Sequence, residues 1–218
     1  PIDHGDSEHL NEDFFRATDI RALIEVVKYL GQKFSDNEIH LIGFSLGGNI
    51  SLRISASPEI NFLKKTIVLS PVINPENSMN AMDKNSWILR KYFIDKWKKT
   101  IRRKIDLYNI NAKEALKHKN IKSLTEYFTE NFTPHSHVRD LFSAYAVTQE
   151  TLNNINHDTF IYSAYDDPCV PIEPLLELEE TTNIKFNARE YGGHCGFIDD
   201  FRFTSSLYHE ISKKLESN

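Results

Sequence analysis

The chain has 218 residues, of which 40% are hydrophobic and 26% are charged, and its formal net charge is −5. This length and composition allow one sizeable core and favour an ordinary globular protein. The acidic balance disfavours a nucleic-acid-binding protein, and no apolar run reaches the roughly 18 residues that a membrane-spanning helix needs. Because no signal segment opens the chain, we expect a cytoplasmic location.

Apolar periodicity along the chain predicts alternating helices and strands. A helical stripe runs through residues 13–34, and residues 39–44 form a short apolar strand. Further strands are expected at 65–70, 159–164 and 184–191, and a last helix within 205–215. Strands that alternate with helices predict an α/β protein with a doubly wound, mostly parallel sheet.

A long interruption separates the second and third of these strands. Residues 72–157 are too many for a plain crossover, and their apolar spacing is helical. We therefore interpret residues 1–74 as the first part of the core, 75–157 as a helical cap insertion, and 158–218 as the second part of the core.

The pattern G-x-S-x-G, Gly43 to Gly47, directly follows the short apolar run Ile39-His40-Leu41-Ile42, at the end of the strand expected at 39–44. A nucleophile elbow has this form, because the serine sits on a strained turn between a strand and a helix and glycines let the backbone pass close by. Ser45 is therefore a candidate nucleophile. The alternative is a glycine-containing turn with an incidental serine.

A serine nucleophile needs a base and an acid, and both follow later in the chain. Asp166 and Asp167 come after the strand at 159–164, and His194 lies on a glycine-rich loop after the strand at 184–191. The carboxyl ends of parallel strands are where such sheets place their chemistry. Asp167 is favoured as the acid because Val-Pro follows it at the usual spacing, and Asp166 is then a turn-forming residue.

Four blocks of sequence together resemble the YheT-like (embryogenesis-associated) branch of the α/β-hydrolase superfamily. They are Asp3-His4-Gly5-Asp6-Ser7-Glu8-His9-Leu10-Asn11, Gly43-Phe44-Ser45-Leu46-Gly47-Gly48-Asn49, Asp166-Asp167-Pro168 and Gly192-Gly193-His194-Cys195-Gly196-Phe197. The resemblance implies a serine carboxylic ester hydrolase that acts on acyl esters or lipids through an acyl-enzyme, without a cofactor. Two alternatives stay open: an acyltransferase that uses an alcohol, and a non-catalytic hydrolase-fold binding protein.

In that branch the opening block follows the fourth strand of the sheet, so the resemblance implies that the amino-terminal strands lie upstream of residue 1. An oxyanion hole takes two backbone N–H donors. Leu46, the residue after the nucleophile, is expected to supply one. The other is expected upstream of this chain.

The chain has two cysteines, Cys169 and Cys195, each beside a candidate catalytic loop. In a reduced compartment they are expected to be free packing residues, and two cysteines fall short of a structural zinc set. His135 and His137 are interpreted as loop residues. We therefore expect no metal.

A basic segment lies within the expected insertion. Residues 83–122 hold 13 Lys or Arg and four Asp or Glu, so they carry about +9 against −14 for the rest. If Lys96, Lys98, Lys99, Arg102, Arg103 and Lys104 face outward, they form a cationic surface. The alternatives are a solvated helix face and peripheral contact with an anionic membrane.

Overall fold

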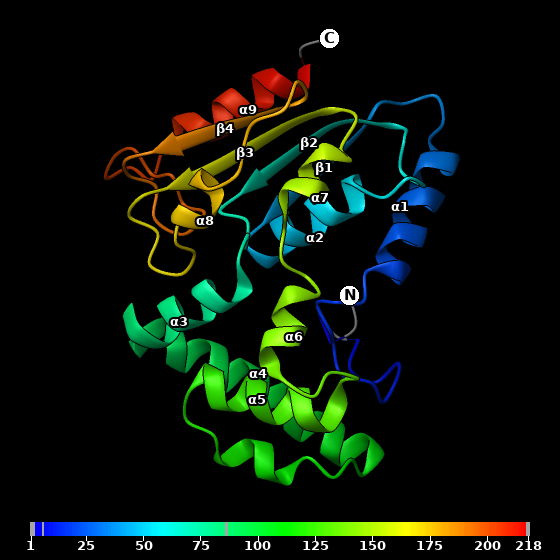
Figure 1. The fold of residues 1–218 in the computed structure, drawn as a ribbon, viewed down its shortest axis with the longest axis vertical. Coiled ribbons are helices and arrows are strands. Elements are labelled where there is room, and N and C mark those ends of the chain that lie inside the picture. The colour runs from blue at the N-terminus through cyan, green and yellow to red at the C-terminus, as the bar shows by residue number, and fades with distance from the viewer. Residues whose placement is uncertain (1–2, 6, 86, 217–218) are drawn as a thin grey trace. The chain divides into compact units, whose positions relative to one another are not determined.

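The computed structural model describes residues 3–5, 7–85 and 87–216. Its contacts divide the chain into two compact units. Residues 19–75 and 146–218 form one, called here the sheet unit, and residues 1–18 and 76–145 form the other, called the helical unit (Figure 1).

The sheet unit is built on four parallel strands in the order β1-β2-β3-β4. Their bounds are Ile39–Phe44 (β1), Leu63–Leu69 (β2), Asp158–Ala164 (β3) and Ile184–Arg189 (β4). The expected α/β class and parallel sheet are confirmed. Because all four strands run the same way, their carboxyl ends meet at one edge, which is where the candidate catalytic residues follow.

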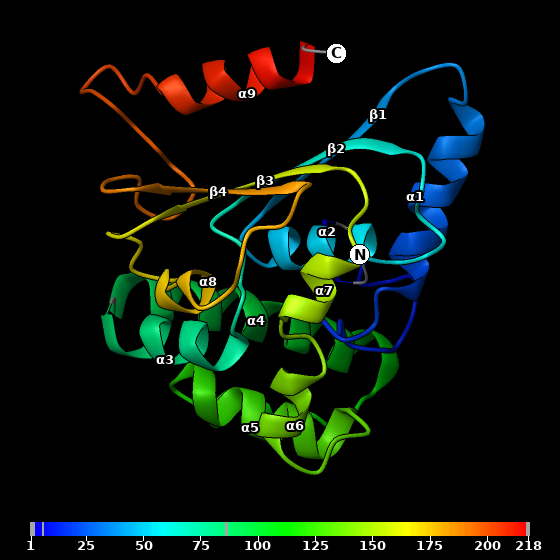
Figure 2. The same cartoon turned by 45° about the horizontal axis from the view of Figure 1, so that its top comes forward.

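Helices cover both faces of this sheet. They are α1 (Arg21–Lys33), α2 (Leu46–Ser55), α7 (Gln149–Asn153), α8 (Glu173–Leu176) and α9 (Ser206–Glu216). Figure 2 shows α9 on one face and α2, α7 and α8 on the other. Successive side chains of a strand alternate between the two faces of the sheet. Ile161 of β3 joins the core that contains Leu52 and Leu175, and the next residue, Tyr162, joins the core that contains Leu207. This is the doubly wound arrangement that the sequence predicts.

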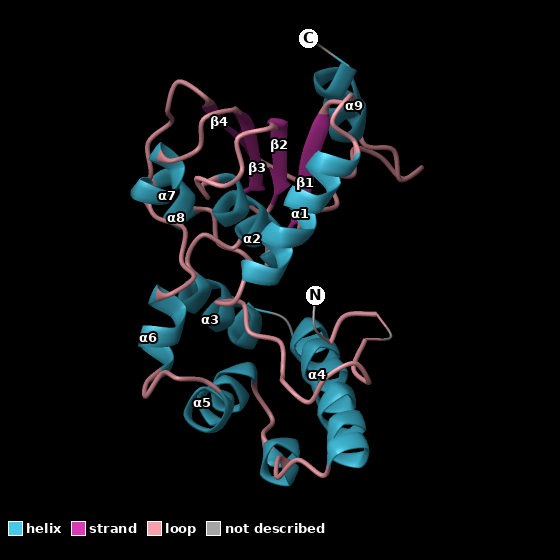
Figure 3. Cartoon of the chain, turned by 90° about the vertical axis from the view of Figure 1, so that its right-hand side faces the viewer, coloured by secondary structure: helices cyan, strands magenta, loops and turns pink. Residues whose placement is uncertain are grey.

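The helical unit consists of helices and connecting loops in its described residues (Figure 3). Its elements are α3 (Pro75–Asn85), α4 (Trp87–Tyr108), a 3₁₀ turn (Lys113–Lys117), α5 (Ile121–Phe132) and α6 (Val138–Ser143). Phe14, Ile101, Leu124 and Phe128 share a buried core here, which explains why the amino-terminal residues group with the insertion. No helix of the described residues is long and apolar enough to span a membrane.

The unit boundaries therefore differ from the division made on sequence. That division assigns residues 1–18 to the core and 146–157 to the insertion, whereas the contacts group 1–18 with 76–145 and place 146–157 in the sheet unit. Val147 shows why, because its N–H donates to the carbonyl of Ile73 and its side chain joins the core of the sheet.

The expectation that six basic side chains of α4 face outward is wrong for Lys104, which is fully buried. Its ammonium lies 2.7 Å from a carboxylate oxygen of Asp3 and donates hydrogen bonds to the carbonyls of Asn11 and Asp13. A buried ammonium needs such partners. Arg103 is half-exposed and pairs with Glu8, so the amino-terminal segment is held to α4 by two neighbouring cations.

Candidate active site

Ser45 occupies the turn between β1 and α2, with φ 53° and ψ −121°. A non-glycine residue rarely adopts this left-handed backbone, and such strain persists where the surroundings enforce it. Its N–H donates to the carbonyl of Leu69 at 2.9 Å, and its carbonyl accepts from the N–H of Val72 at 3.2 Å. The serine is thus fixed to the end of β2 and to the segment that follows it.

Glycine is required at position 43 because of close approach rather than backbone angle. A Cβ there would lie 2.4 Å from the Oγ of Ser51 and 2.5 Å from the carbonyl oxygen of Gly47. At Gly47 itself an added Cβ would meet nothing within 4 Å. The first glycine of the pattern therefore allows the strand to pass tightly under the helix.

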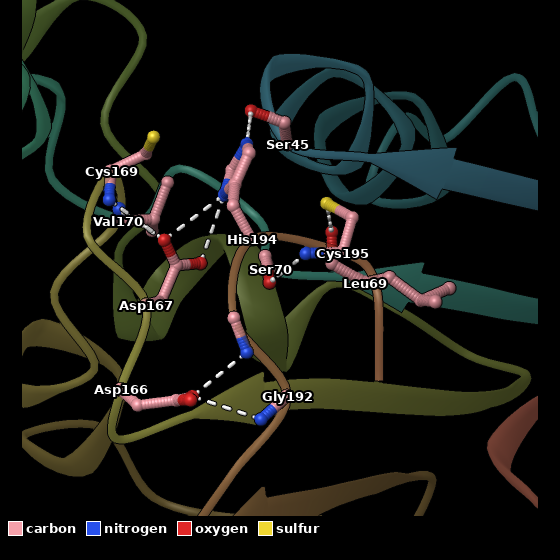
Figure 4. A network of polar contacts seen from close by, with 11 residues as sticks. Ser45, Leu69, Ser70, Asp166, Asp167, Cys169, Val170, Gly192, His194 and Cys195 are labelled. Carbon is pink, nitrogen blue, oxygen red and sulfur yellow. Dashed lines mark hydrogen bonds and ion pairs between the residues drawn. The ribbon is translucent and has the colours of Figure 1, made fainter. Parts of the chain in front are cut away.

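The structure brings together Ser45, His194 and Asp167 (Figure 4). Nε2 of His194 lies 2.9 Å from Oγ of Ser45, and Nδ1 lies 2.9 and 3.1 Å from the two carboxylate oxygens of Asp167. Because an ionised carboxylate only accepts, Asp167 holds the proton of the neutral ring on Nδ1 and leaves a lone pair on Nε2 facing the serine hydroxyl.

Asp167 is itself held firmly. Its side chain is 1% exposed, and its Oδ1 accepts the N–H groups of Cys169 at 2.8 Å and Val170 at 3.0 Å. Backbone donors of this kind stabilise the charged carboxylate in a buried position. The loop after β3 thus presents an ionised group to the imidazole.

The neighbouring Asp166 has a different place. Its Oδ1 accepts the N–H groups of Gly192 and Gly193, at 2.9 and 2.8 Å, so it fastens the backbone of the loop that carries His194 (Figure 4). The two adjacent aspartates therefore both hold His194 in place, Asp167 through its ring and Asp166 through its loop.

The charge state of His194 is set by opposing influences. Burial disfavours the charged ring and lowers its pKa, whereas the hydrogen bond and negative charge of Asp167 raise it, and the net pKa lies above its usual value. The same site acts on Cys169, where burial first and the charge of Asp167 second raise the pKa of the thiol to about 11. The buried thiol is therefore a poor nucleophile at neutral pH.

Sequence reasoning missed Ser70, which directly follows β2. It is buried, has φ 46°, and its N–H donates to the carbonyl of Tyr162 at 2.7 Å. Its Oγ accepts the N–H of Cys195 at 3.3 Å, and so braces the loop next to His194. The signal in the sequence that could have indicated Ser70 is a serine at the end of a buried strand.

Cys195, expected to be a packing residue, directs its thiol to the carbonyl of Leu69 at 3.5 Å.

Leu46 is the first residue of α2. The first N–H groups of an α-helix have no partner within the helix and carry partial positive charge. This places a backbone donor directly beside the serine.

Among the described residues, one group of three side chains could hold a metal ion, and it consists of Asp167, Cys169 and His194. His135 and His137 are not part of this group.

A parallel doubly wound sheet with a serine at a strained strand-to-helix turn defines an α/β hydrolase. The chain belongs to the family described as alpha/beta hydrolase fold, which it matches over residues 3–201. It is 22% identical over 196 residues to Abhydrolase domain-containing protein 2 of Drosophila melanogaster, a match that covers 80% of this chain. The chain spans about half, 48%, of the length of that relative.

Solved structures share the fold at low sequence identity. A serine hydrolase from the bacterium Cycloclasticus zankles has a TM-score of 0.59 at 16% identity, covering 100% of this chain and 78% of that one. An esterase from Pyrococcus furiosus has a TM-score of 0.54 at 16% identity, covering 91% and 61%. A meta-cleavage product hydrolase from Pseudomonas fluorescens has a TM-score of 0.57 at 13% identity, covering 98% and 78%.

Proposed function

We propose that the protein is a serine carboxylic ester hydrolase that uses Ser45, His194 and Asp167 as a catalytic triad. The observation that carries the proposal is the continuous chain of contacts from the Ser45 hydroxyl through both nitrogens of His194 to the buried carboxylate of Asp167. A binding protein has no need for a serine in a strained turn within 2.9 Å of a correctly oriented imidazole.

In the proposed reaction the Oγ of Ser45 attacks the ester carbonyl while Nε2 of His194 takes its proton. The imidazolium that forms is stabilised by Asp167 and returns the proton to the leaving alcohol. The backbone N–H of Leu46 donates one of the two hydrogen bonds that a developing oxyanion takes. Water, activated by the same histidine, then releases the acid from the acyl-enzyme.

We also propose that the protein lies in the YheT-like branch and acts on acyl esters or lipids. The four sequence blocks support the branch, and the esterase among the structures of the same fold is consistent with an ester as the substrate class. The chain length of the acyl group and the alcohol are left to a substrate screen, in which transfer to an added alcohol would reveal the acyltransferase alternative.

The test is hydrolysis of a series of p-nitrophenyl esters by the wild type, Ser45→Ala and His194→Ala. Each substitution should lower kcat by several powers of ten, because members of a triad act as a unit. Circular dichroism of each variant serves as the control for folding. If Ser45→Ala keeps a tenth of the wild-type rate, the serine is not the nucleophile.

A peripheral contact with anionic lipid is proposed for α4. Lys96, Lys99 and Arg102 are exposed on this helix, and each such cation contributes roughly 1 kcal/mol at an anionic surface. Reversing the three to Glu should weaken binding to anionic vesicles at low salt and leave binding to neutral vesicles unchanged. Equal binding to anionic vesicles before and after the change would leave these residues as a solvated helix face.

A further inference from the structure

Cys169 has no step in the proposed hydrolysis, yet it lies beside Asp167 and His194. The residue is 2% exposed, and its backbone N–H is bound to Asp167. Its Sγ, a carboxylate oxygen of Asp167 and a ring nitrogen of His194 all lie within 4.8 Å of one another. Figure 4 shows the thiol on the Asp167 side of the imidazole, whereas Cys195 follows His194 on its own loop.

One thiol, one imidazole and one carboxylate are the donor types that Zn²⁺ takes in tetrahedral sites with three protein ligands. The hard ions Ca²⁺ and Mg²⁺ prefer oxygen alone. Ligand atoms around a tetrahedral zinc are about 3.3–3.8 Å apart, given Zn–N and Zn–S bonds of about 2.0–2.3 Å. A separation at the 4.8 Å limit therefore needs to contract by about 1 Å, whereas the contact of 2.9 Å between Asp167 and His194 needs to open slightly. Rotation of the Cys169 side chain and a small shift of the ring would supply both changes.

We propose that Asp167, Cys169 and His194 form an inhibitory site for Zn²⁺. On binding, Cys169 releases its proton to solvent and its thiolate sulfur donates a lone pair to the metal, with no change in oxidation state. If the metal takes Nδ1 of His194, it displaces the contact with Asp167 and the ring proton moves to Nε2, which then has no lone pair for the Ser45 proton. If it takes Nε2, it removes the lone pair that accepts the Ser45 proton. Either way the base is lost and hydrolysis stops.

The functional test rests on the proposed hydrolysis. Ester hydrolysis is measured against Zn²⁺ concentration for the wild type, Cys169→Ser and Cys195→Ser, each relative to its own metal-free rate, with reversal by EDTA. The matched Cys195→Ser variant should be inhibited like the wild type. Cys169→Ser should need at least about tenfold more Zn²⁺ because a hydroxyl is a poor zinc ligand. Inhibition of Cys169→Ser at the wild-type concentration would overturn the proposal.

A second measurement does not depend on activity. Co²⁺ bound to a thiolate absorbs in the near ultraviolet through ligand-to-metal charge transfer, so it is added to purified wild type, Ser45→Ala, Cys169→Ser and Cys195→Ser. The band should form in all but Cys169→Ser, which is checked for folding by circular dichroism. A band that persists in Cys169→Ser, or that needs Cys195, would refute the site even if the protein is an esterase. Absence of the band from all four proteins would also refute it.

Discussion

The two adjacent aspartates allow a matched pair of substitutions, Asp166→Asn and Asp167→Asn. In Asp167→Asn the remaining side-chain oxygen can still accept the two backbone N–H groups. The NH2 group that replaces the second oxygen only donates, so it cannot accept the Nδ1 proton of His194. The ring of His194 then carries its proton on Nε2, and this nitrogen can no longer accept the hydroxyl proton of Ser45. At Asp166 the asparagine oxygen can keep both bonds to the glycine N–H groups, and only the charge is lost.

The expected rates differ accordingly. Asparagine in place of the triad aspartate lowers turnover by about 10⁴ in serine proteases, equivalent to about 5 kcal/mol of barrier. We expect a loss of about 10³–10⁴ for Asp167→Asn and less than about tenfold for Asp166→Asn, where two neutral bonds replace two charge-assisted ones. The assay is kcat/KM on a short p-nitrophenyl ester, with circular dichroism as the control. Equal losses, or the larger loss in Asp166→Asn, would refute the assignment of the acid.

Three further predictions concern pH and stability. His194 must be neutral to act as the base, and its net pKa is raised above the usual value. Therefore kcat/KM should fall with decreasing pH through a midpoint above 6.5. A midpoint at or below 6.5 would contradict this prediction. Gly43→Ala should lower the free energy of unfolding by about 1–3 kcal/mol, because the added Cβ meets backbone atoms. Gly47→Ala should be neutral or should stabilise the protein by up to about 1 kcal/mol, because its Cβ meets nothing. Equal stabilities of the two variants in denaturant titration would argue against the tight turn. Lys104→Met should destabilise the protein by about 3–5 kcal/mol, because it leaves a buried carboxylate unpaired and also removes the hydrogen bonds to Asn11 and Asp13. Arg103→Met should cost less, because the Arg103 side chain is itself 45% exposed, although its partner Glu8 is only 10% exposed. Similar unfolding midpoints for the two variants would show that the buried pair is dispensable.

The sheet and the site could be predicted because both leave local patterns in the sequence. The strand at Ile39–Phe44 is a short apolar run, and Ser45 and His194 follow strands within glycine-containing turns. The sequence pattern that favours Asp167 over Asp166 is weaker, and the three-dimensional structure is needed to show that Asp167 reaches the ring of His194 whereas Asp166 binds the loop.

Other features depend on contacts between distant segments and have no local pattern. Lys104 looks like one more cation on a basic helix, but its ammonium binds the carbonyl of Asn11, 93 residues away. Ser70 is 125 residues from the N–H of Cys195 that it accepts. Hydropathy reports which side chains prefer water, and it cannot report a buried partner that satisfies a charge.

The central claim is that Ser45 is an activated nucleophile, and labelling with a fluorophosphonate probe tests it most directly. Probe is added to wild type, Ser45→Ala and His194→Ala at neutral pH, and the modified peptide is identified by mass spectrometry. The proposed mechanism predicts stoichiometric labelling of Ser45 in the wild type, strongly slowed labelling in His194→Ala, and none at this site in Ser45→Ala. A folded wild-type protein that is not labelled, or that is labelled at a different residue, would contradict the claim.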